Sequence, residues 1–488
     1  MSRSLQTPVL VGVGACSQRQ EDPGHALEPV ALMAKALEQA AQDAGAPDLL
    51  SRADSVRVPR GLWEYPNPSR WLCERFGASG ARTQVSEVGV LQSTLIGQAA
   101  RDIAEGQAQI VLIAGGEAKY RSLRSKITGI DAPLSTQPDV EADEVLRPSG
   151  DILHPLEIER GAVMPVRQYA MLENALRADE GLSLDAHRDE IARIWSAMSK
   201  VAQDNPDAWD RTPVSAEMIR EATASNPMVA FPYTKFHNSQ WNVDQAAGLI
   251  LCSAETARSA GLSEENWIHP WVNTESNQML NFSERARPET CPGFGIAGRR
   301  AFGLADRDPN RIEHRELYSC FPSAVRMQVR ELGIDPKAQL TETGGMRFGG
   351  GPLNNFVLQA TVRMARVLRE DPGSLGLVTA VSGVLTKQGV MIFGTECPPQ
   401  GFQFEDVTTE VKKATAVCPF LAELEGPAQI VAYTVLYEDN TPQQAILLCQ
   451  NDSEQRTLAT TSNRELAEAM TREEFCGRTV EVSGHVVR

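Results

Sequence analysis

Buried strands and amphipathic helices alternate along the first part of the chain. The run PVLVGVGA at 8–15 has the length and the continuous apolar character of a strand buried on both faces. The segment at 28–45 keeps its apolar residues on one helical stripe and ends at Gly45, a residue type that commonly terminates helices. A second striped helix begins near Leu91 and leads into another buried strand at 109–118. The pattern therefore predicts the order strand, helix, helix, strand.

The same order of elements returns later in the chain. The segment RELYSCF at 315–321 leads into a helix that begins near Pro322 and ends at Gly333. A striped helix at 350–373 then precedes a buried strand at 375–384. Two halves with one order indicate an internal duplication. Buried strands that alternate with amphipathic helices predict an α/β fold with predominantly parallel central strands.

Two further segments lie between and after these halves. The first is a stretch of polar helices broken by proline-containing turns, which we interpret as an elaboration laid over the core. From about 405, polar and apolar residues alternate as in strands, with YEDNTPQQ as a hairpin turn. We therefore expect four units: a first half at 1–118 plus 241–270, a helical insertion at 119–240, a second half at 271–400, and a small OB-like β domain at 405–488.

Composition and charge exclude several classes of protein. Hydrophobic residues make up 42% of the chain, and no apolar run reaches the roughly 18–20 residues that a membrane helix needs. A net charge of −16 argues against nucleic-acid binding, which depends on lysine and arginine. Nine cysteines are scattered singly, which favours reduced thiols and a cytoplasmic protein. We expect no metal, and no nicotinamide cofactor, because Ser17 replaces the third glycine of GVGACS.

Four short motifs carry a resemblance to a known superfamily. They are AGGEA after an apolar strand, NVDQAAGLILCSAETA at 242–257, YSCF before a helix, and GGMRFGGGP before another helix. In their order and spacing they resemble the thiolase superfamily, and in particular the thiolase-like branch with an extra C-terminal β domain that is related to sterol-carrier-type thiolases. The resemblance implies a layered αβαβα core of two duplicated halves, with a helical insertion and a small C-terminal all-β domain. It also implies an acetyl-CoA acetyltransferase-like protein.

The resemblance also locates the catalytic groups that thiolases use. The nucleophilic cysteine falls at Gly89, the histidine of the GHP turn at Gly351, and the cysteine of the CxG turn near Val381. The HDCF segment becomes YSCF at 318–321. All three thiol or imidazole groups are therefore absent. Claisen condensation or thiolysis through a cysteinyl acyl-enzyme is not expected at this site.

Three remaining side chains are candidates for catalysis, each with a structural alternative. Tyr318 can donate a hydrogen bond to a thioester or enolate oxygen, or it can be a core tyrosine. His237 can act as a general base, or it can be held by loop hydrogen bonds. Cys320 precedes a helix N-terminus, where a thiolate is favoured, or it is a small buried hydrophobe.

Other polar residues are candidates for binding a CoA thioester, which we expect as ligand or substrate. By resemblance, the segment PYTKFHNSQW holds the pantetheine arm, and two arginines after AGGEA suit the phosphates of 3′-phospho-ADP, although a solvated surface run explains them equally well. The candidates are Lys235, Asn238, Ser239, Asn354, Asn355, Thr386, Lys387, Arg121 and Arg124.

Three functional hypotheses follow. The leading one is an acyltransferase-like protein of lipid metabolism that binds acyl-CoA as a monomer or homodimer. The first rival is a retro-aldol lyase that cleaves 3-hydroxyacyl-CoA through Tyr318, with the C-terminal module acting as a fused OB-fold partner. The second rival is a non-catalytic acyl-CoA-binding protein.

Overall fold

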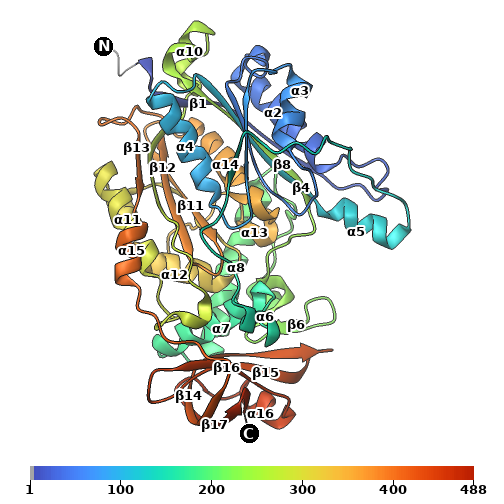
Figure 1. The fold of residues 1–488 in the computed structure, drawn as a ribbon, viewed down its shortest axis with the longest axis vertical. Coiled ribbons are helices and arrows are strands. Elements are labelled where there is room, and N and C mark those ends of the chain that lie inside the picture. Colours follow the sequence, from blue (N-terminus) through green and yellow to red (C-terminus); the bar gives the residue numbers. More distant parts are fainter. Residues whose placement is uncertain (1–4, 488) are drawn as a thin grey trace.

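Two mixed sheets, separated by helices, form the core of the computed structural model, which describes residues 5–487 (Figure 1). The first sheet has the order β1-β8-β4-β2-β3-β5, and the second has the order β10-β11-β12-β9-β13. The strands of the first are β1 (Pro8–Gln18), β2 (Ser55–Pro59), β3 (Arg82–Ser86), β4 (Ile110–Ala118), β5 (Glu144–Leu146) and β8 (Asp244–Ser253). Those of the second are β9 (His269–Ser276), β10 (His314–Glu316), β11 (Leu375–Ser382), β12 (Lys387–Gly394) and β13 (Gln403–Asp406).

The two sheets repeat one arrangement. The order β2-β4-β8-β1 in the first sheet returns as β10-β11-β12-β9 in the second. In each case the first pair is parallel and the next two pairs are antiparallel. The predicted duplication of an α/β core is therefore confirmed.

The expectation of predominantly parallel central strands holds except for one long strand in each sheet, β8 or β12, which runs against all the others. The long pairings of β8 with β1 and β4, and of β12 with β11 and β9, are all antiparallel. Strands covered by helices on both faces read as continuous apolar runs in either direction. The hydrophobic pattern therefore reports the burial of these strands and not their orientation.

Helices complete five layers. Helices α4 (Gln92–Ala104) and α14 (Phe356–Glu370) lie between the sheets and contact both, while α2 (Pro29–Ala44) covers the outer face of the first sheet. Helix α11 (Pro292–Ala305) covers the outer face of the second sheet and packs on α12 (Pro322–Leu332). Shorter helices are α3 (Pro68–Phe76), α10 (Ala254–Ser259), α13 (Gly345–Phe348) and α15 (Thr408–Ala414).

The glycines of the GVGACS motif serve helix packing. A Cβ on Gly12 would clash with the carbonyl oxygen of Ala40, and one on Gly14 would clash with that of Ala36. Both alanines belong to α2, which therefore approaches β1 more closely than any side chain would permit. This close approach explains the glycine spacing without a dinucleotide.

The insertion differs from its prediction as a polar elaboration. Helix α7 (Pro165–Asp179) is buried almost all round, because it packs against both α12 and the C-terminal β domain. Its polar side chains are paired inside the protein, and a count of polar residues therefore underestimates its burial. The other insertion elements are α5 (Lys119–Thr128), α6 (Pro155–Glu159), α8 (Leu184–Asp204), α9 (Ala216–Arg220), β6 (Met228–Ala230) and β7 (Tyr233–Thr234).

A small all-β domain closes the chain, as expected, and lies at the end of the long axis (Figure 1). Its hairpin turns at Asp439 and Asn440, which both have positive φ, the geometry of a tight two-residue turn. β6 from the insertion pairs with its longest strand, β14. Within residues 5–487, no helix is both long and apolar enough to cross a membrane. The domain contains β14 (Leu424–Glu438), β15 (Thr441–Gln450), β16 (Arg456–Thr461), α16 (Arg464–Ala469), β17 (Thr479–Gly484) and β18 (Val486–Val487).

Candidate active site

The starts of the two middle-layer helices meet at the expected reaction centre. The side-chain amide of Gln92, the first residue of α4, donates to the carbonyl oxygen of Leu353 at 3.4 Å. Its carbonyl oxygen accepts from the backbone N–H of Val357 in α14 at 2.8 Å. One glutamine therefore holds the two helix starts together.

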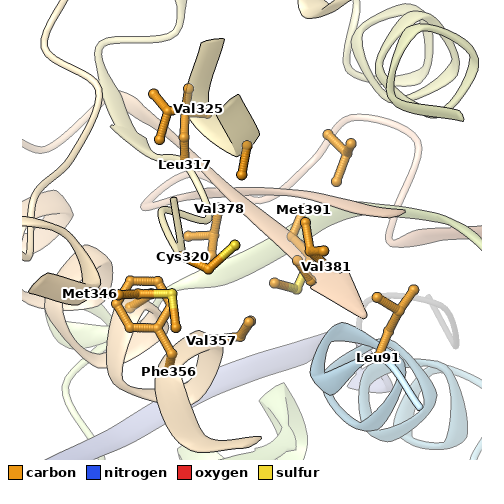
Figure 2. Close-up of a cluster of buried hydrophobic side chains, with 14 of the residues drawn as sticks. Leu91, Leu317, Cys320, Val325, Met346, Phe356, Val357, Val378, Val381 and Met391 are labelled. Carbon is orange, nitrogen blue, oxygen red and sulfur yellow. The ribbon is translucent and has the colours of Figure 1, made fainter. Parts of the chain in front are cut away.

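Apolar side chains fill the space around these helix starts (Figure 2). They come from the segment before α4, from β11 and β12, from α13 and α14, and from the residues around the start of α12, and all are buried. We call them the apolar cluster: Leu91, Leu317, Cys320, Val325, Met346, Phe356, Val357, Val378, Val381 and Met391. Where the resemblance places a CxG cysteine, Val381 packs in this cluster.

The start of α4 carries no reacting group. Gly89 has a φ of +107°, and a Cβ there would lie 3.0 Å from the side chain of Pro148. Its neighbours Val90 and Leu91 are buried and apolar. The glycine to which the resemblance assigns the nucleophile position is therefore covered by the loop around Pro148.

The turn before α14 joins two other predicted segments. The backbone N–H of Gly351 donates to the carbonyl oxygen of Gln240 at 2.9 Å. A Cβ on Gly351 would lie 3.2 Å from the Cβ of Ser239, whose hydroxyl donates to the carbonyl oxygen of Cys320 at 2.8 Å. Three segments that are far apart in the sequence, around residues 239, 320 and 351, therefore meet at one place.

Two candidates from the YSCF segment lie beside the apolar cluster. Tyr318 is partly exposed and meets Phe356 edge-on, with ring centroids 5.7 Å apart. Within residues 5–487 its hydroxyl makes no hydrogen bond, and burial raises its pKa. Cys320 is 8% exposed, and burial raises the pKa of its thiol to about 12. The thiol is therefore protonated at neutral pH, and Tyr318 remains able to donate.

His237 is used inside its own loop. Its Nδ1 accepts a hydrogen bond from the backbone N–H of Thr234 at 3.2 Å and lies 3.0 Å from the Thr234 hydroxyl, which itself donates to the carbonyl oxygen of Ile219 at 2.7 Å. Burial lowers its pKa to about 3, so the ring is neutral. Its Nε2 is buried without a partner. The histidine therefore closes the turn at residues 234–237 and packs beside Tyr233.

The two arginines predicted for phosphate binding are engaged elsewhere. The guanidinium of the buried Arg121 donates to the carbonyl oxygens of residues 23, 26, 132 and 133, at 3.0 to 3.3 Å. Arg124 forms an ion pair with Glu21 at 3.0 Å. Arg121 thus fixes the chain around it. Lys235, which belongs to the predicted pantetheine segment, is an exposed cation.

The remaining candidates surround the site at different depths. Asn238 donates to the carbonyl oxygen of Thr234 at 2.8 Å, and Asn354 donates to that of Arg60 at 2.8 Å. Asn355 is buried, and both polar atoms of its amide lack a hydrogen-bond partner among residues 5–487. Thr386 donates to the carbonyl oxygen of Ser382 at 3.0 Å.

Lys387 and Glu275 are two buried ionisable side chains at the second sheet, and within residues 5–487 they form no ion pair with each other. Lys387 is 2% exposed, and burial lowers its pKa while Glu275 opposes this shift. Glu275 accepts from the hydroxyl of Thr94 at 2.8 Å and from the amide of Asn277 at 3.0 Å. Burial raises the pKa of Glu275 to about 7.

Tyr169 on α7 is a site residue that the sequence analysis missed. Its ring stacks on Phe321 with centroids 4.6 Å apart, and its hydroxyl donates to the carbonyl oxygen of Gly383 at 3.2 Å. It also hydrogen-bonds the thiol of Cys320. Tyr169 and Glu173 are four residues apart, so they lie on the same face of α7. This spacing is the signal in the sequence that could have identified that face as facing inward.

Glu173 lies at the centre of a buried polar cluster. Its carboxylate pairs with Arg326, accepts from His187 at 2.9 Å, and accepts from the hydroxyl of Tyr233 at 2.5 Å. That hydroxyl lies 2.9 Å from the hydroxyl of Ser323. Burial would raise the pKa of Glu173, but Arg326 and His187 outweigh it and lower the pKa to about 2. We call these five residues the polar cluster.

Comparisons with known proteins agree with this architecture. Residues 406–485 match the family model of the thiolase-like protein type 1 additional C-terminal domain. An acetyl-CoA acetyltransferase from Methanocaldococcus jannaschii is 25% identical over 258 residues, which span 53% of this chain and only 58% of that relative. A monomeric SCP2-thiolase-like protein type 1 from Mycobacterium smegmatis superposes with a TM-score of 0.83 at 27% identity, over 99% of both chains. An Ltp2–ChsH2(DUF35) aldolase superposes with a TM-score of 0.61 at 19% identity, over 81% of this chain and 99% of that one.

The chain therefore belongs to the thiolase superfamily, as its motifs predicted. Within that superfamily it is similar along its whole length to the type 1 thiolase-like protein, and it carries the additional C-terminal domain. Because one fold can host several chemistries, the activity has to be argued from the residues of the site.

Proposed function

We propose that the chain binds an acyl-CoA thioester and acts on it, if at all, without a cysteinyl acyl-enzyme. The observation that carries this proposal is the meeting of Gly351, Ser239 and Cys320 in front of two helix starts that hold no thiolate or imidazole. The retained fold and a relative named acetyl-CoA acetyltransferase support a thioester as ligand. The apolar cluster beside this meeting point disfavours a charged intermediate.

Calorimetric titration with acetyl-CoA and octanoyl-CoA tests the binding. Ser239→Trp would place an indole over Gly351, and we expect it to weaken binding by at least about tenfold. Ser263→Trp is the matched control, because Ser263 is exposed in another part of the chain. Absence of binding to the wild-type protein, or equal losses in the two variants, would contradict the proposal.

Intact-mass spectrometry tests the absence of a covalent intermediate. After incubation with acetyl-CoA we expect unmodified protein, because the thiol of Cys320 is protonated and the segment that leads into α4, Gly89 to Leu91, carries no thiol. An acetyl group on Cys320 would show that a nucleophile operates here.

A second candidate function is retro-aldol cleavage of a 3-hydroxyacyl-CoA. Tyr318 favours it, because its hydroxyl is free to donate to a thioester or enolate oxygen beside the apolar cluster. The shared fold of an aldolase adds support. Tyr318→Phe should abolish release of a ketone or aldehyde, whereas Tyr120→Phe, which alters a tyrosine paired with Glu21, should not. Unchanged release in Tyr318→Phe would remove this role.

The third candidate is a non-catalytic acyl-CoA-binding protein in the cytoplasm. It is favoured if a thioester binds but no acyl, thiol or carbonyl product forms on prolonged incubation. The apolar cluster supports this candidate, because packed apolar side chains, rather than a nucleophile, fill the expected reaction centre. Product formation from any acyl-CoA would exclude it.

A further inference from the structure

A groove runs along helix α11 on the outer face of the second sheet. It contains a cavity of about 360 Å³. The side chain of Gln388 lies against Gly293 of α11, whereas the adjacent Gly389 lies against Ser93 of α4. Neighbouring residues of β12 thus face the groove and the middle layer respectively, so the cavity and the apolar cluster lie on opposite faces of this strand. The cavity is lined by Arg285, Arg287, Thr290, Pro292, Gly295, Ile296, Arg299, Glu331 and residues 414–416.

Arg285 brings a buried positive charge to the wall of this cavity. It is 5% exposed, and one terminal nitrogen of its guanidinium donates to the carbonyl oxygen of Val384. The other terminal nitrogen is buried without a hydrogen-bond partner, and within residues 5–487 Arg285 forms no ion pair. A buried charge without a counter-charge is costly, so this position favours an anion.

The other charges around the cavity leave a positive excess. Arg299 is exposed, and in the described part of the chain it forms no ion pair. Arg287 is already paired with Glu289 at 2.7 Å. Glu331 is the one carboxylate in the lining, and it accepts from the backbone N–H of Cys291 at 3.0 Å. Three cations therefore line the cavity beside one carboxylate, and within residues 5–487 Arg285 and Arg299 form no ion pair.

A second buried arginine strengthens the positive field behind the cavity. Arg456 from β16 is 2% exposed and donates to the carbonyl oxygens of Arg285 and Ala286. Its guanidinium therefore fixes the backbone that carries Arg285 and adds a charge that no carboxylate within residues 5–487 pairs with. The C-terminal domain thereby contributes to this wall of the groove.

We propose that this groove binds a small organic anion whose carboxylate or phosphate pairs with the exposed guanidinium of Arg299, in the positive field of the buried Arg285. Guanidinium groups suit both anions, because they offer paired donors in a planar fork. The volume lies near the lower end of roughly 300–1,000 Å³ for ligand pockets, which fits a small molecule rather than a bare ion. Pro292, Ile296 and Ala414 supply apolar contacts for its remainder. This site is separate from the proposed acyl-CoA site.

Calorimetry with benzoate and phenyl phosphate, at constant ionic strength, tests this proposal on the full chain. Inorganic phosphate forms a third arm that separates recognition of an organic anion from recognition of the charge alone. We expect saturable binding of at least one organic probe and weaker binding of inorganic phosphate. Arg299→Glu should weaken organic-anion binding at least about tenfold, because it replaces a charge-assisted contact by repulsion. Ala414→Trp should also weaken it by filling the open side of the cavity.

Both substitutions change exposed residues, so we expect them to leave the fold intact, which circular dichroism verifies. Arg193→Glu is the matched control, because Arg193 is exposed on α8, away from the lining. Wild-type protein that shows no saturable binding of either organic probe would overturn the proposal. Equal binding by wild type, Arg299→Glu and Ala414→Trp would also overturn it. Acyl-CoA titrations of the same variants distinguish this outcome from failure of the proposed function.

Discussion

Two clusters of side chains lie next to each other at the start of helix α12 and differ in kind. The apolar cluster takes Leu317, Cys320 and Val325 from this segment, whereas the polar cluster takes Ser323 and Arg326. The first occupies the positions where thiolases carry reacting groups. The second holds the insertion against the second half of the core. Apolar side chains therefore fill the expected reaction centre. The buried charged residues nearby have a structural role, because they hold α7 against α12.

Removing the centre of the polar cluster should have the largest effect. Glu173→Ala leaves the buried Arg326 and His187 without their shared carboxylate, and we expect a loss of about 3–5 kcal/mol in the free energy of unfolding. Urea unfolding followed by circular dichroism measures it. Glu190→Gln is the control, because Glu190 also contacts Arg326 but is partly exposed, and it should cost about 1 kcal/mol or less. Equal losses would show that Glu173 is not the centre of the cluster.

A cavity in the apolar cluster should have a smaller effect. Met346→Ala removes a buried side chain that packs beside Phe356, and we expect a loss of about 2–4 kcal/mol. Met218→Ala, at a position 58% exposed, should change stability by less than about 0.5 kcal/mol. The same unfolding measurement applies. A negligible loss for Met346→Ala would indicate that the cluster is loosely packed and open to a ligand.

The pH dependence of stability should reveal the buried acid on the inner face of the second sheet. The folded state holds the pKa of Glu275 near 7, above its ordinary value of 4.5, so the folded protein binds more protons between these values. Stability should therefore fall as pH rises from 4.5 to 7, by at most about 1.4 kcal/mol per pH unit from this group. Glu275→Gln should remove this contribution, as unfolding at a series of pH values would show. An unchanged slope would mean that Glu275 is ionised in the folded state.

Much of the fold could be predicted from the sequence, because apolar runs and helical stripes report burial directly. The order of elements in the two halves followed from Gly45, Gly333 and the buried runs around them. The reversed direction of β8 and β12 did not follow, since strands that are covered on both faces show the same apolar pattern in either direction. The burial of α7 did not follow either, because its Glu173 and Asn174 read as solvated residues until their partners, which lie far away in the sequence, are known.

The site was predictable in outline but not in the use of its side chains. That Gly89 and Gly351 replace catalytic groups stays a prediction from the motifs, whereas the structure does bring Gly351 to Ser239. Arg121 resembled a phosphate ligand, yet backbone carbonyls take its whole guanidinium. Tyr169, which lies next to the site, belongs to α7 of the insertion, and none of the motifs contains it. Hydrogen bonds between distant parts of the chain decide such roles, and local sequence does not encode them.

The strand β5 also limits how the first sheet can be extended. It covers β3 in parallel register and is only three residues long, from Glu144 to Leu146. A strand of a neighbouring molecule that added to this edge could form only a few backbone hydrogen bonds with β5. Short border strands of this kind are a common safeguard against uncontrolled stacking of chains. On its β5 side, therefore, the first sheet offers a neighbouring chain little backbone to pair with.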